Sequence, residues 1–249
     1  MIDQHVNIQT ADGTMNTFVT HPDEGGPFPA VLFLMDAPGK REELHDMARR
    51  LGTAGYYVML PNLYYRAEPS FDYTAIAAQP DARARMFALM ATLTDELVVG
   101  DAAALLAHAD ADAAAAADGP VGCVGYCMSG PFVVAVAGSF PERVAAAASF
   151  HGVRLWGDGA PVELLDRAKG ELYFGCAEHD DYAPNEVIEG LTAHLAATGA
   201  RARVEWYPGT AHGFVFPQRE GVYDKPAAER HWERLLALYD RTLRRSVSA

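Results

Sequence analysis

The apolar positions of the chain fall into two alternating patterns, short buried runs and longer stretches with helical spacing. Continuous apolar runs predict strands buried on both faces, and apolar residues three or four positions apart predict amphipathic helices. The predicted strands cover residues 30–35, 56–60, 121–126, 144–150, 172–174 and 202–207. The predicted helices cover residues 41–54, 82–108, 129–138, 185–198 and 227–243. Strand and helix therefore alternate along almost the whole chain.

The chain begins differently, with two extended segments joined by a turn. Residues 6–10 and 15–21 flank Ala11-Asp12-Gly13-Thr14, which is typical of a β-hairpin turn. The alternation after it predicts an α/β fold, with a mostly parallel sheet, helices on both faces and this antiparallel hairpin at the start. No internal repeat, linker or change in composition divides the sequence, so we expect one domain spanning residues 1–249.

Composition narrows the range of partners. The formal net charge is −13, whereas nucleic-acid binding would need a basic surface. The N-terminus has no basic and apolar leader, and no apolar run approaches the ~20 residues that span a bilayer. Three cysteines cannot all pair within one chain, so a reducing, cytoplasmic setting is expected. We therefore expect a small-molecule partner, no nucleic acid or membrane, and a monomer or homodimer.

A glycine-flanked cysteine stands where one predicted strand passes into a helix. Residues 125–130 read Gly-Tyr-Cys-Met-Ser-Gly, the context of a nucleophile elbow with Cys127 at the position usually held by serine. Glycines are needed two residues before and three after it, because larger side chains would collide in so tight a turn. The positive N-terminal end of the helix favours a thiolate. The backbone N–H of Met128 is then placed to bind an oxyanion.

A buried structural cysteine beside a glycine-rich turn is the alternative interpretation of this segment. Cys123 and Cys176 fit that alternative, because both lie in or at the end of apolar strands without an elbow. We therefore expect Cys127 to be the reactive cysteine and the other two to belong to the core.

A carboxylate and a histidine follow later strands in the order expected for a nucleophile–acid–base triad. His212 lies in a loop between the last predicted strand and the final helix, whereas most other histidines lie on helices or flank the hairpin. Asp180 directly follows an apolar strand and would accept a hydrogen bond from the imidazole. Asp181 and Glu178 are alternatives, and these acids could instead cap the next helix. The sequence predicts that Cys127, His212 and Asp180 meet at the carboxyl edge of the sheet.

These segments together resemble the dienelactone hydrolase family over nearly the whole chain. The resemblance is most specific at residues 125–130, 178–184 and 207–214, and it extends to 61–66, which read Pro-Asn-Leu-Tyr-Tyr-Arg. It implies an α/β-hydrolase fold, a Cys-His-Asp triad and a substrate-binding role for Arg66, whose planar guanidinium can hold both oxygens of a carboxylate. A solvated surface arginine is the other interpretation of this residue.

Two places depart from the family pattern. After the strand at 30–35 the family has Gln-Glu-x-x-Gly, where this chain has Met-Asp-Ala-Pro-Gly. By resemblance, Asp36 replaces a glutamate that controls protonation of the nucleophile, and the N–H of Ala37 is the second oxyanion donor. Some members have an arginine four residues after the histidine, where this chain has Phe216, with Arg219 out of register. The resemblance thus supports the reaction type more than the dienelactone itself.

The expected reaction is hydrolysis of a small ester or lactone of the carboxymethylenebutenolide type, without cofactor or metal. Tyr65, Phe214 and Phe216 are expected to line an aromatic pocket, although aromatic clusters are often plain core. The polar segment around His179 lacks a second histidine at metal-ligand spacing. Other classes stay open: an esterase or thioesterase for a different substrate, a non-catalytic binding protein on the same scaffold, or a redox sensor at Cys127.

Overall fold

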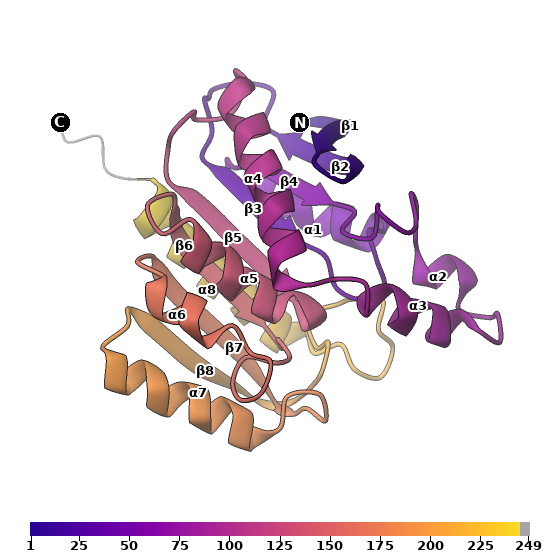
Figure 1. The fold of residues 1–249 in the computed structure, drawn as a ribbon, viewed down its shortest axis with the longest axis vertical. Coiled ribbons are helices and arrows are strands. Elements are labelled where there is room, and N and C mark those ends of the chain that lie inside the picture. The colour runs from indigo at the N-terminus through magenta and orange to yellow at the C-terminus, as the bar shows by residue number, and fades with distance from the viewer. Residues whose placement is uncertain (245–249) are drawn as a thin grey trace. The chain divides into compact units, whose positions relative to one another are not determined.

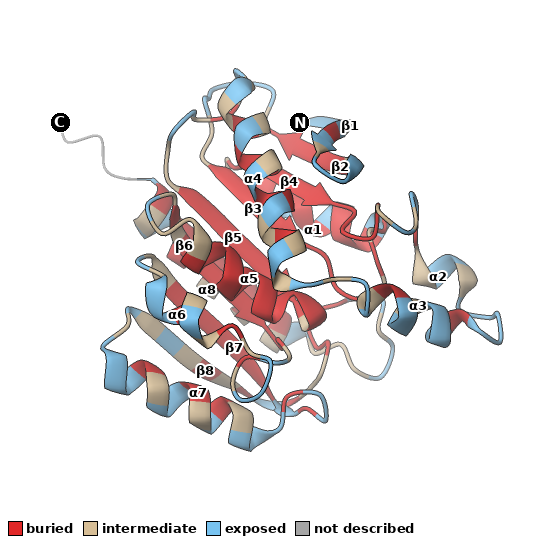
Figure 2. Ribbon diagram, viewed as in Figure 1, coloured by how far each residue is buried: buried red, intermediate tan, exposed pale blue. Residues whose placement is uncertain are grey.

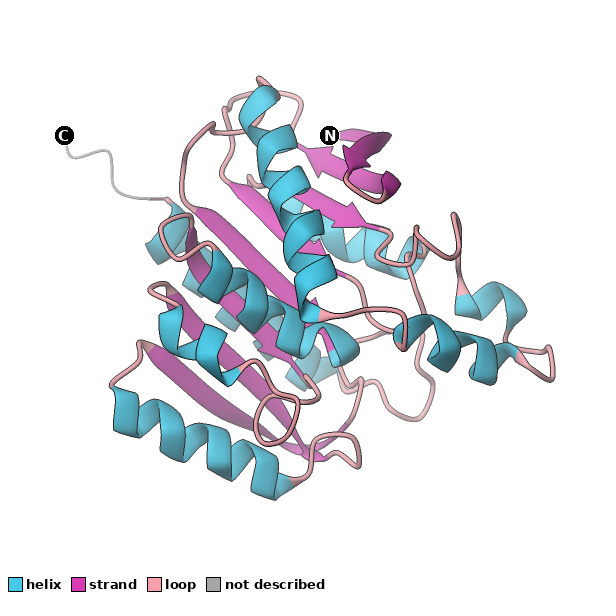
Figure 3. Cartoon of the chain, viewed as in Figure 1, coloured by secondary structure: helices cyan, strands magenta, loops and turns pink. Residues whose placement is uncertain are grey.

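The computed structural model describes residues 1–244 of the 249-residue chain (Figure 1). Its backbone forms two compact units, Met1–Gly119 and a second unit from Pro120 onward. Both units combine strands with helices, as the alternating apolar patterns predict (Figure 3). The architecture is α/β and starts with the expected antiparallel hairpin. The single domain expected over residues 1–249 stays a prediction.

The strands of the first unit pair in the order β1-β2-β4-β3. The hairpin β1–β2 is antiparallel, as is the pair β2–β4, whereas β3 and β4 are parallel. Helix α1 covers one face of these strands and α4 lies on the other (Figure 1). The elements of this unit are β1 (Ile2–Thr10), β2 (Gly13–His21), β3 (Ala30–Leu34), α1 (Glu42–Thr53), β4 (Tyr57–Pro61), α2 (Tyr73–Ile76), α3 (Ala82–Met90) and α4 (Asp95–Ala111).

Apolar side chains account for this arrangement. Strands β3 and β4 are buried along their whole length, as their continuous apolar runs predict (Figure 2). Helix α1 turns Leu44, Met47 and Leu51 inward at helical spacing, and each is at most 5% exposed. Burying each of these side chains stabilises the fold by roughly 1.5–3 kcal/mol.

The strands of the second unit pair in the order β5-β6-β7-β8 and are all parallel. Helices α5, α6 and α7 lie on one face of these strands and α8 packs on the other (Figure 1). The elements are β5 (Val121–Tyr126), the 3₁₀ turn η1 (Cys127–Ser129), α5 (Gly130–Ser139), β6 (Val144–Phe150), α6 (Val162–Arg167), β7 (Glu171–His179), α7 (Asn185–Thr198), β8 (Ala202–Ala211) and α8 (Lys225–Leu243).

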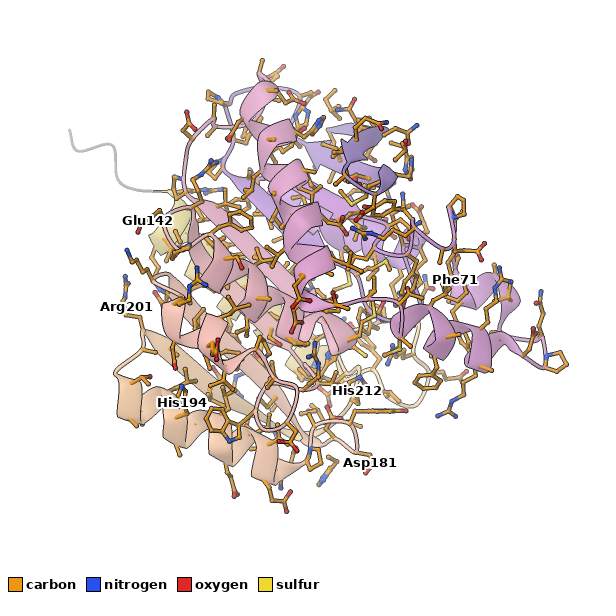
Figure 4. The ribbon with its side chains drawn as sticks, in the orientation of Figure 1. Phe71, Glu142, Asp181, His194, Arg201 and His212 are labelled. Carbon is orange, nitrogen blue, oxygen red and sulfur yellow. The ribbon has the colours of Figure 1, made fainter. Side chains whose placement is uncertain are left out.

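Parallel pairing brings the carboxyl ends of β5 to β8 to one edge of the second unit. Figure 4 shows this polarity: His212 and Asp181, which follow β8 and β7, lie at one end of the strands. Glu142 and Arg201, which precede β6 and β8, lie at the other end. The loops that the sequence singles out therefore share the carboxyl edge, where α/β sheets place their functional groups.

The helix expected over residues 82–108 is wrong in its length, because two helices replace it. Helix α3 ends at Met90, and α4 starts anew at Asp95. Thr94 separates them: its hydroxyl accepts the backbone N–H of Leu97 at 3.3 Å, which is an N-cap. The short helices α2 and α6 were not expected, because four and six residues are too few to show a period.

The longest helix of the second unit does not resemble a membrane span. Helix α8 has 19 residues, and acidic and basic side chains recur along it. Within residues 1–244, no helix combines the length and the apolar composition that crossing a bilayer would require.

Candidate active site

Cys127 lies in a sharp turn between β5 and α5, as the sequence predicts. Tyr126 is still extended, with φ −128°, whereas Cys127 has φ +53°. A non-glycine residue in this left-handed region is strained, and such strain is common at functional sites. The chain then forms the turn η1, and α5 starts at Gly130. The cysteine side chain is half-buried, in contrast to the fully enclosed residues before it.

The two glycines of the elbow have the steric role that the sequence predicts. A Cβ atom on Gly125 would lie 2.7 Å from Cγ2 of Val133 and 2.9 Å from Cβ of Ser129. A Cβ atom on Gly130 would lie 2.6 Å from the Cα of Gly152. Contacts this short do not occur for real Cβ atoms, so larger residues at either position would displace the turn.

Strand pairing brings Asp180 and His212 together. The parallel pairing of β7 and β8 is irregular after Ala177 and resumes at the pair His179–Ala211, so Asp180 and His212 are the residues that directly follow the two strands. Nδ1 of His212 lies 2.8 Å from Oδ2 of Asp180. A carboxylate can only accept, so the imidazole donates this hydrogen bond. Both side chains are enclosed, with 10% of His212 and 2% of Asp180 exposed.

The structure distinguishes Asp180 from its acidic neighbours. The other oxygen of Asp180, Oδ1, accepts the backbone N–H groups of Tyr182 at 2.9 Å and Ala183 at 3.2 Å. Asp181 is exposed, and the carboxylate of Glu178 accepts the N–H of Gly209 at 2.6 Å. Asp180 is therefore the acid of this loop that contacts the imidazole, and its own loop backbone fixes its orientation.

His212 bridges the carboxylate and the sulfur. Burial alone would lower the pKa of His212, but hydrogen bonds to Asp180 and to Cys127, and charge interactions with both groups, raise it to about 9. The imidazole is thus held mainly in its protonated form at neutral pH. Asp180 and Cys127, which lie far from His212 in the sequence, therefore both interact with its imidazole.

Sequence analysis missed His151, which directly follows β6. Its ring centroid lies 4.9 Å from that of His212, and the residue is 1% exposed with φ +38°. Nδ1 donates to the carbonyl oxygen of Phe150 at 2.6 Å, while Nε2 has no hydrogen-bond partner among the residues described. Burial, together with the charges of His212, Arg219 and His231, holds the pKa of His151 well below its usual value. Its position after a buried parallel strand is the signal that could have identified it.

Tyr182 was also missed. Its ring centroid lies 4.8 Å from that of His212, and 53% of the residue is exposed, so one side of this aromatic ring is open to solvent. This exposed aromatic ring lies beside the imidazole. It follows Asp180 by two residues, but sequence spacing alone does not indicate which way a loop side chain turns.

Two of the three aromatic residues expected to line a pocket are enclosed in the second unit. Phe214 and Phe216 are both 0% exposed, and their rings lie 5.8 Å and 5.4 Å from that of His151. Both rings pack beside His151 and are not accessible to solvent, so their contact with a substrate stays a prediction. The guanidinium carbon of Arg219 lies 4.8 Å from the ring centroid of Phe216. A Cβ on Gly213 would lie 2.3 Å from Nη1 of Arg219, so this cation packs against the residue that follows His212.

Arg66 and Tyr65 belong to the first unit, where an acidic residue already engages both. Two nitrogens of Arg66 donate to the two carboxylate oxygens of Asp101 at 2.7 and 3.0 Å, and Nε donates to Asp12 at 2.8 Å. Asp101 is fully buried and also accepts the Tyr65 hydroxyl at 2.9 Å. The guanidinium therefore neutralises a buried carboxylate of its own chain, and its contact with a substrate carboxylate stays a prediction.

Asp36, in the first unit, forms a buried ion pair. Both of its oxygens accept hydrogen bonds from the guanidinium of Arg41, which also donates to Glu43 at 2.7 Å. All three side chains are at most 5% exposed. The Tyr64 hydroxyl donates to the carbonyl oxygen of Ala37 at 2.9 Å and fixes the backbone there. The roles expected for Asp36 and Ala37 stay predictions.

The other two cysteines are enclosed, as expected. Cys123 is 0% and Cys176 is 4% exposed, and neither forms a disulfide. Burial raises the pKa of both thiols, that of Cys176 to about 12, so both are held in the unreactive thiol form. Among the described side chains, no cluster of three or more His, Cys, Asp or Glu is arranged to hold a metal ion.

Known proteins match this chain over most of its length. The model described as the dienelactone hydrolase family matches residues 15–243. A carboxymethylenebutenolidase of Rhodococcus opacus is 26% identical over 251 residues, covering 96% of this chain and 92% of that protein. A Klebsiella pneumoniae structure assigned as a dienelactone hydrolase has a TM-score of 0.85 at 23% identity, covering 96% of this chain and 98% of that one. A dienelactone hydrolase structure from Anabaena variabilis has a TM-score of 0.70 at 17% identity, covering 98% and 99%.

Proposed function

The chain belongs to the dienelactone hydrolase family, and we propose that it cleaves small esters or lactones with Cys127 as nucleophile, His212 as base and Asp180 as the carboxylate that orients the base. The observation that carries this proposal is the hydrogen bond from His212 to Asp180, and the raised pKa of His212, to which Cys127 also contributes, supports it. A nucleophile activated by an adjacent base, which a third group orients, is the arrangement that acyl transfer needs.

The proposed reaction proceeds in two halves. The Cys127 thiolate attacks the ester carbonyl, and the N–H groups of Met128 and Ala37 stabilise the oxyanion. The tetrahedral intermediate collapses, the C–O bond breaks, and the His212 imidazolium gives its proton to the leaving alkoxide or enolate. The neutral imidazole then takes a proton from water, which attacks the thioester and releases the acid and the thiolate. In a lactone the leaving oxygen and the acid belong to one product.

A lactone that carries a carboxylate would need a cationic side chain to bind it. The Rhodococcus opacus relative is a carboxymethylenebutenolidase, so a carboxymethylenebutenolide-type lactone is the first substrate to try. Arg66 would have to share its guanidinium between Asp101 and a substrate carboxylate. Arg219 lies against Gly213, the residue after His212, and burial together with the charge of Arg219 lowers the pKa of His151, so Arg219 is a second candidate for binding such a carboxylate. If Arg219 binds a substrate carboxylate, Arg219→Ala raises KM for anionic lactones and leaves neutral esters unchanged.

Cys127→Ala, compared with Cys123→Ala, tests the nucleophile. Turnover of p-nitrophenyl acetate and of an anionic lactone should fall by about a thousandfold or more in the first variant and stay close to wild type in the second. Circular dichroism checks that both variants fold. Wild-type turnover in folded Cys127→Ala would reject the assignment.

Two further measurements, ester binding and mass spectrometry after mild peroxide, separate the other function classes. A non-catalytic binding protein would bind esters without turning them over in either variant. A redox sensor would show a reversible mass increase at Cys127 under mild peroxide in a wild-type protein that has no ester turnover. We also propose a reducing, cytoplasmic setting, because a half-buried reactive thiol has to stay reduced to act.

A further inference from the structure

Lys40, in the first unit, forms hydrogen bonds with two neutral side chains. It lies in the loop between β3 and α1 and is half-buried. Its ammonium donates to the amide oxygen of Asn16 on β2, and Nζ lies 3.3 Å from Nδ1 of His5 on β1. An ammonium can only donate, so His5 offers its unprotonated nitrogen to Lys40. Neither partner brings the negative charge that normally stabilises a lysine cation.

The charged groups around this pair are engaged elsewhere. Glu42, the acid next in sequence, uses one oxygen for His45 at 2.8 Å and the other for Arg49 at 2.5 Å. Arg49 also donates to Asp3 at 2.7 Å. Burial lowers the pKa of Lys40 to about 8, and no neighbouring charge offsets it. Burial and the charge of Lys40 also lower the pKa of His5, so the imidazole is neutral at ordinary pH.

We propose that Lys40 and His5 form a nucleophile–base pair that accepts an acyl group from activated acyl donors such as acyl phosphates. The lone pair of Nζ attacks the acyl carbon, an N–C bond forms, and the bond from that carbon to the phosphate oxygen breaks. Inorganic phosphate leaves, and the proton lost from nitrogen passes to Nδ1 of His5 and on to solvent. The product is an amide at Lys40, and the step needs no oxidant or reductant. This site is separate from the residues of the proposed function.

The chain has two further lysines, which serve as internal controls. Lys169 is 65% exposed and pairs with Glu142, and Lys225 is exposed at the first turn of α8. Neither has a histidine partner among the described contacts. At about pH 7.5, Lys40 with its lowered pKa is unprotonated far more often than an ordinary lysine, which is unprotonated roughly once in a thousand. A lower pKa also makes an amine intrinsically less nucleophilic, and partial burial slows access, so we expect a net advantage of about tenfold.

The test is site-resolved acetylation by acetyl phosphate. The protein carries Cys127→Ala, so that no acetyl group arrives through that thiol, and peptide mass spectrometry follows acetylation of all three lysines with time. Lys40 should react about tenfold faster than Lys169 and Lys225. Equal or slower acetylation of Lys40 would overturn the proposal.

Two variants of the exposed His5 test the role of the base. His5→Phe removes the acceptor, and His5→Gln keeps a hydrogen-bond acceptor that cannot take a proton. Both should slow acetylation of Lys40 severalfold and leave Lys169 and Lys225 unchanged. An unchanged rate at Lys40 in His5→Gln would show that an acceptor is sufficient and would reject the pair. These outcomes are independent of whether the chain hydrolyses esters.

Discussion

The rings of His151 and His212 lie with their centroids 4.9 Å apart, and the two histidines have opposite pKa shifts. Asp180 and Cys127 favour the protonated form of His212, whereas burial without an acidic partner keeps His151 neutral. Two neighbouring imidazolium ions would repel each other. A neutral His151 therefore lets His212 hold its proton while the aromatic ring restricts its movement.

The raised pKa of His212 predicts a loss of stability in alkaline solution. The folded state holds this proton up to about pH 9, whereas the unfolded histidine releases it near its ordinary value of 6.5. The stabilisation is fully present below 6.5 and is lost as the pH rises through 9. Urea unfolding at about pH 6 and about pH 9.5 should show that wild type loses up to about 3 kcal/mol more than His212→Gln. The same pH dependence in both proteins would contradict the prediction.

The lowered pKa of His151 predicts the opposite behaviour in acid. The unfolded histidine takes up a proton below its ordinary value of 6.5, whereas the folded one stays neutral. Stability is therefore complete above 6.5 and falls as the pH decreases. Between about pH 6.5 and about pH 5, wild type should lose about 1.5 kcal/mol more free energy of unfolding than His151→Phe. The comparison concerns the slope with pH, so a constant offset between the two proteins does not affect it.

Replacing the orienting carboxylate should reduce activity without unfolding the chain. Asp180→Asn removes the charge that stabilises the imidazolium, and an amide NH₂ could face Nδ1. We expect kcat/KM for p-nitrophenyl acetate to fall by about a thousandfold to ten-thousandfold. Asp181→Asn, at the exposed neighbouring acid, is the matched control and should stay within about twofold of wild type. Equal losses in both variants would indicate a general effect of the loop.

Arg66→Ala should cost stability because it leaves the buried Asp101 carboxylate without its cation. Breaking a buried pair by removing one partner costs about 3–5 kcal/mol. Arg85→Ala is the control, since its pair with Glu68 is 42% and 27% exposed and should change the free energy of unfolding little. Chemical denaturation measures the free energy of unfolding of both variants. A small effect of Arg66→Ala, together with a raised KM for anionic substrates alone, would instead favour the substrate-binding role.

Local patterns in the sequence predicted much of the second unit. The strands at residues 121–126 and 144–150 and the helix at 185–198 have their expected bounds, because apolar runs and glycine or proline define their ends. The elbow was predicted for a similar reason: its strain and its glycine requirement arise within six residues. What is encoded over short distances in the chain can be inferred from the sequence.

Contacts between distant segments could not be predicted in this way. The partner of Arg66 is Asp101, 35 positions away on a helix whose apolar pattern gives no sign of a buried acid. The complete burial of Phe214 and Phe216 depends on His151 and Tyr126, which are presented by other strands. The break in the helix expected over 82–108 is different, because Thr94 followed by two acids is a recognisable helix start.

The ladder between β7 and β8 also limits how this site can change. Since the last pair is His179–Ala211, inserting a single residue directly after this pair on either strand would move Asp180 or His212 out of alignment by about 3.3 Å. A loop grafted after either strand would thus have to keep Asp180 or His212 directly after the pair His179–Ala211. Length variation can be accommodated beyond the two functional residues, in the segments that lead to α7 and α8, and that is where libraries for altered selectivity should be built.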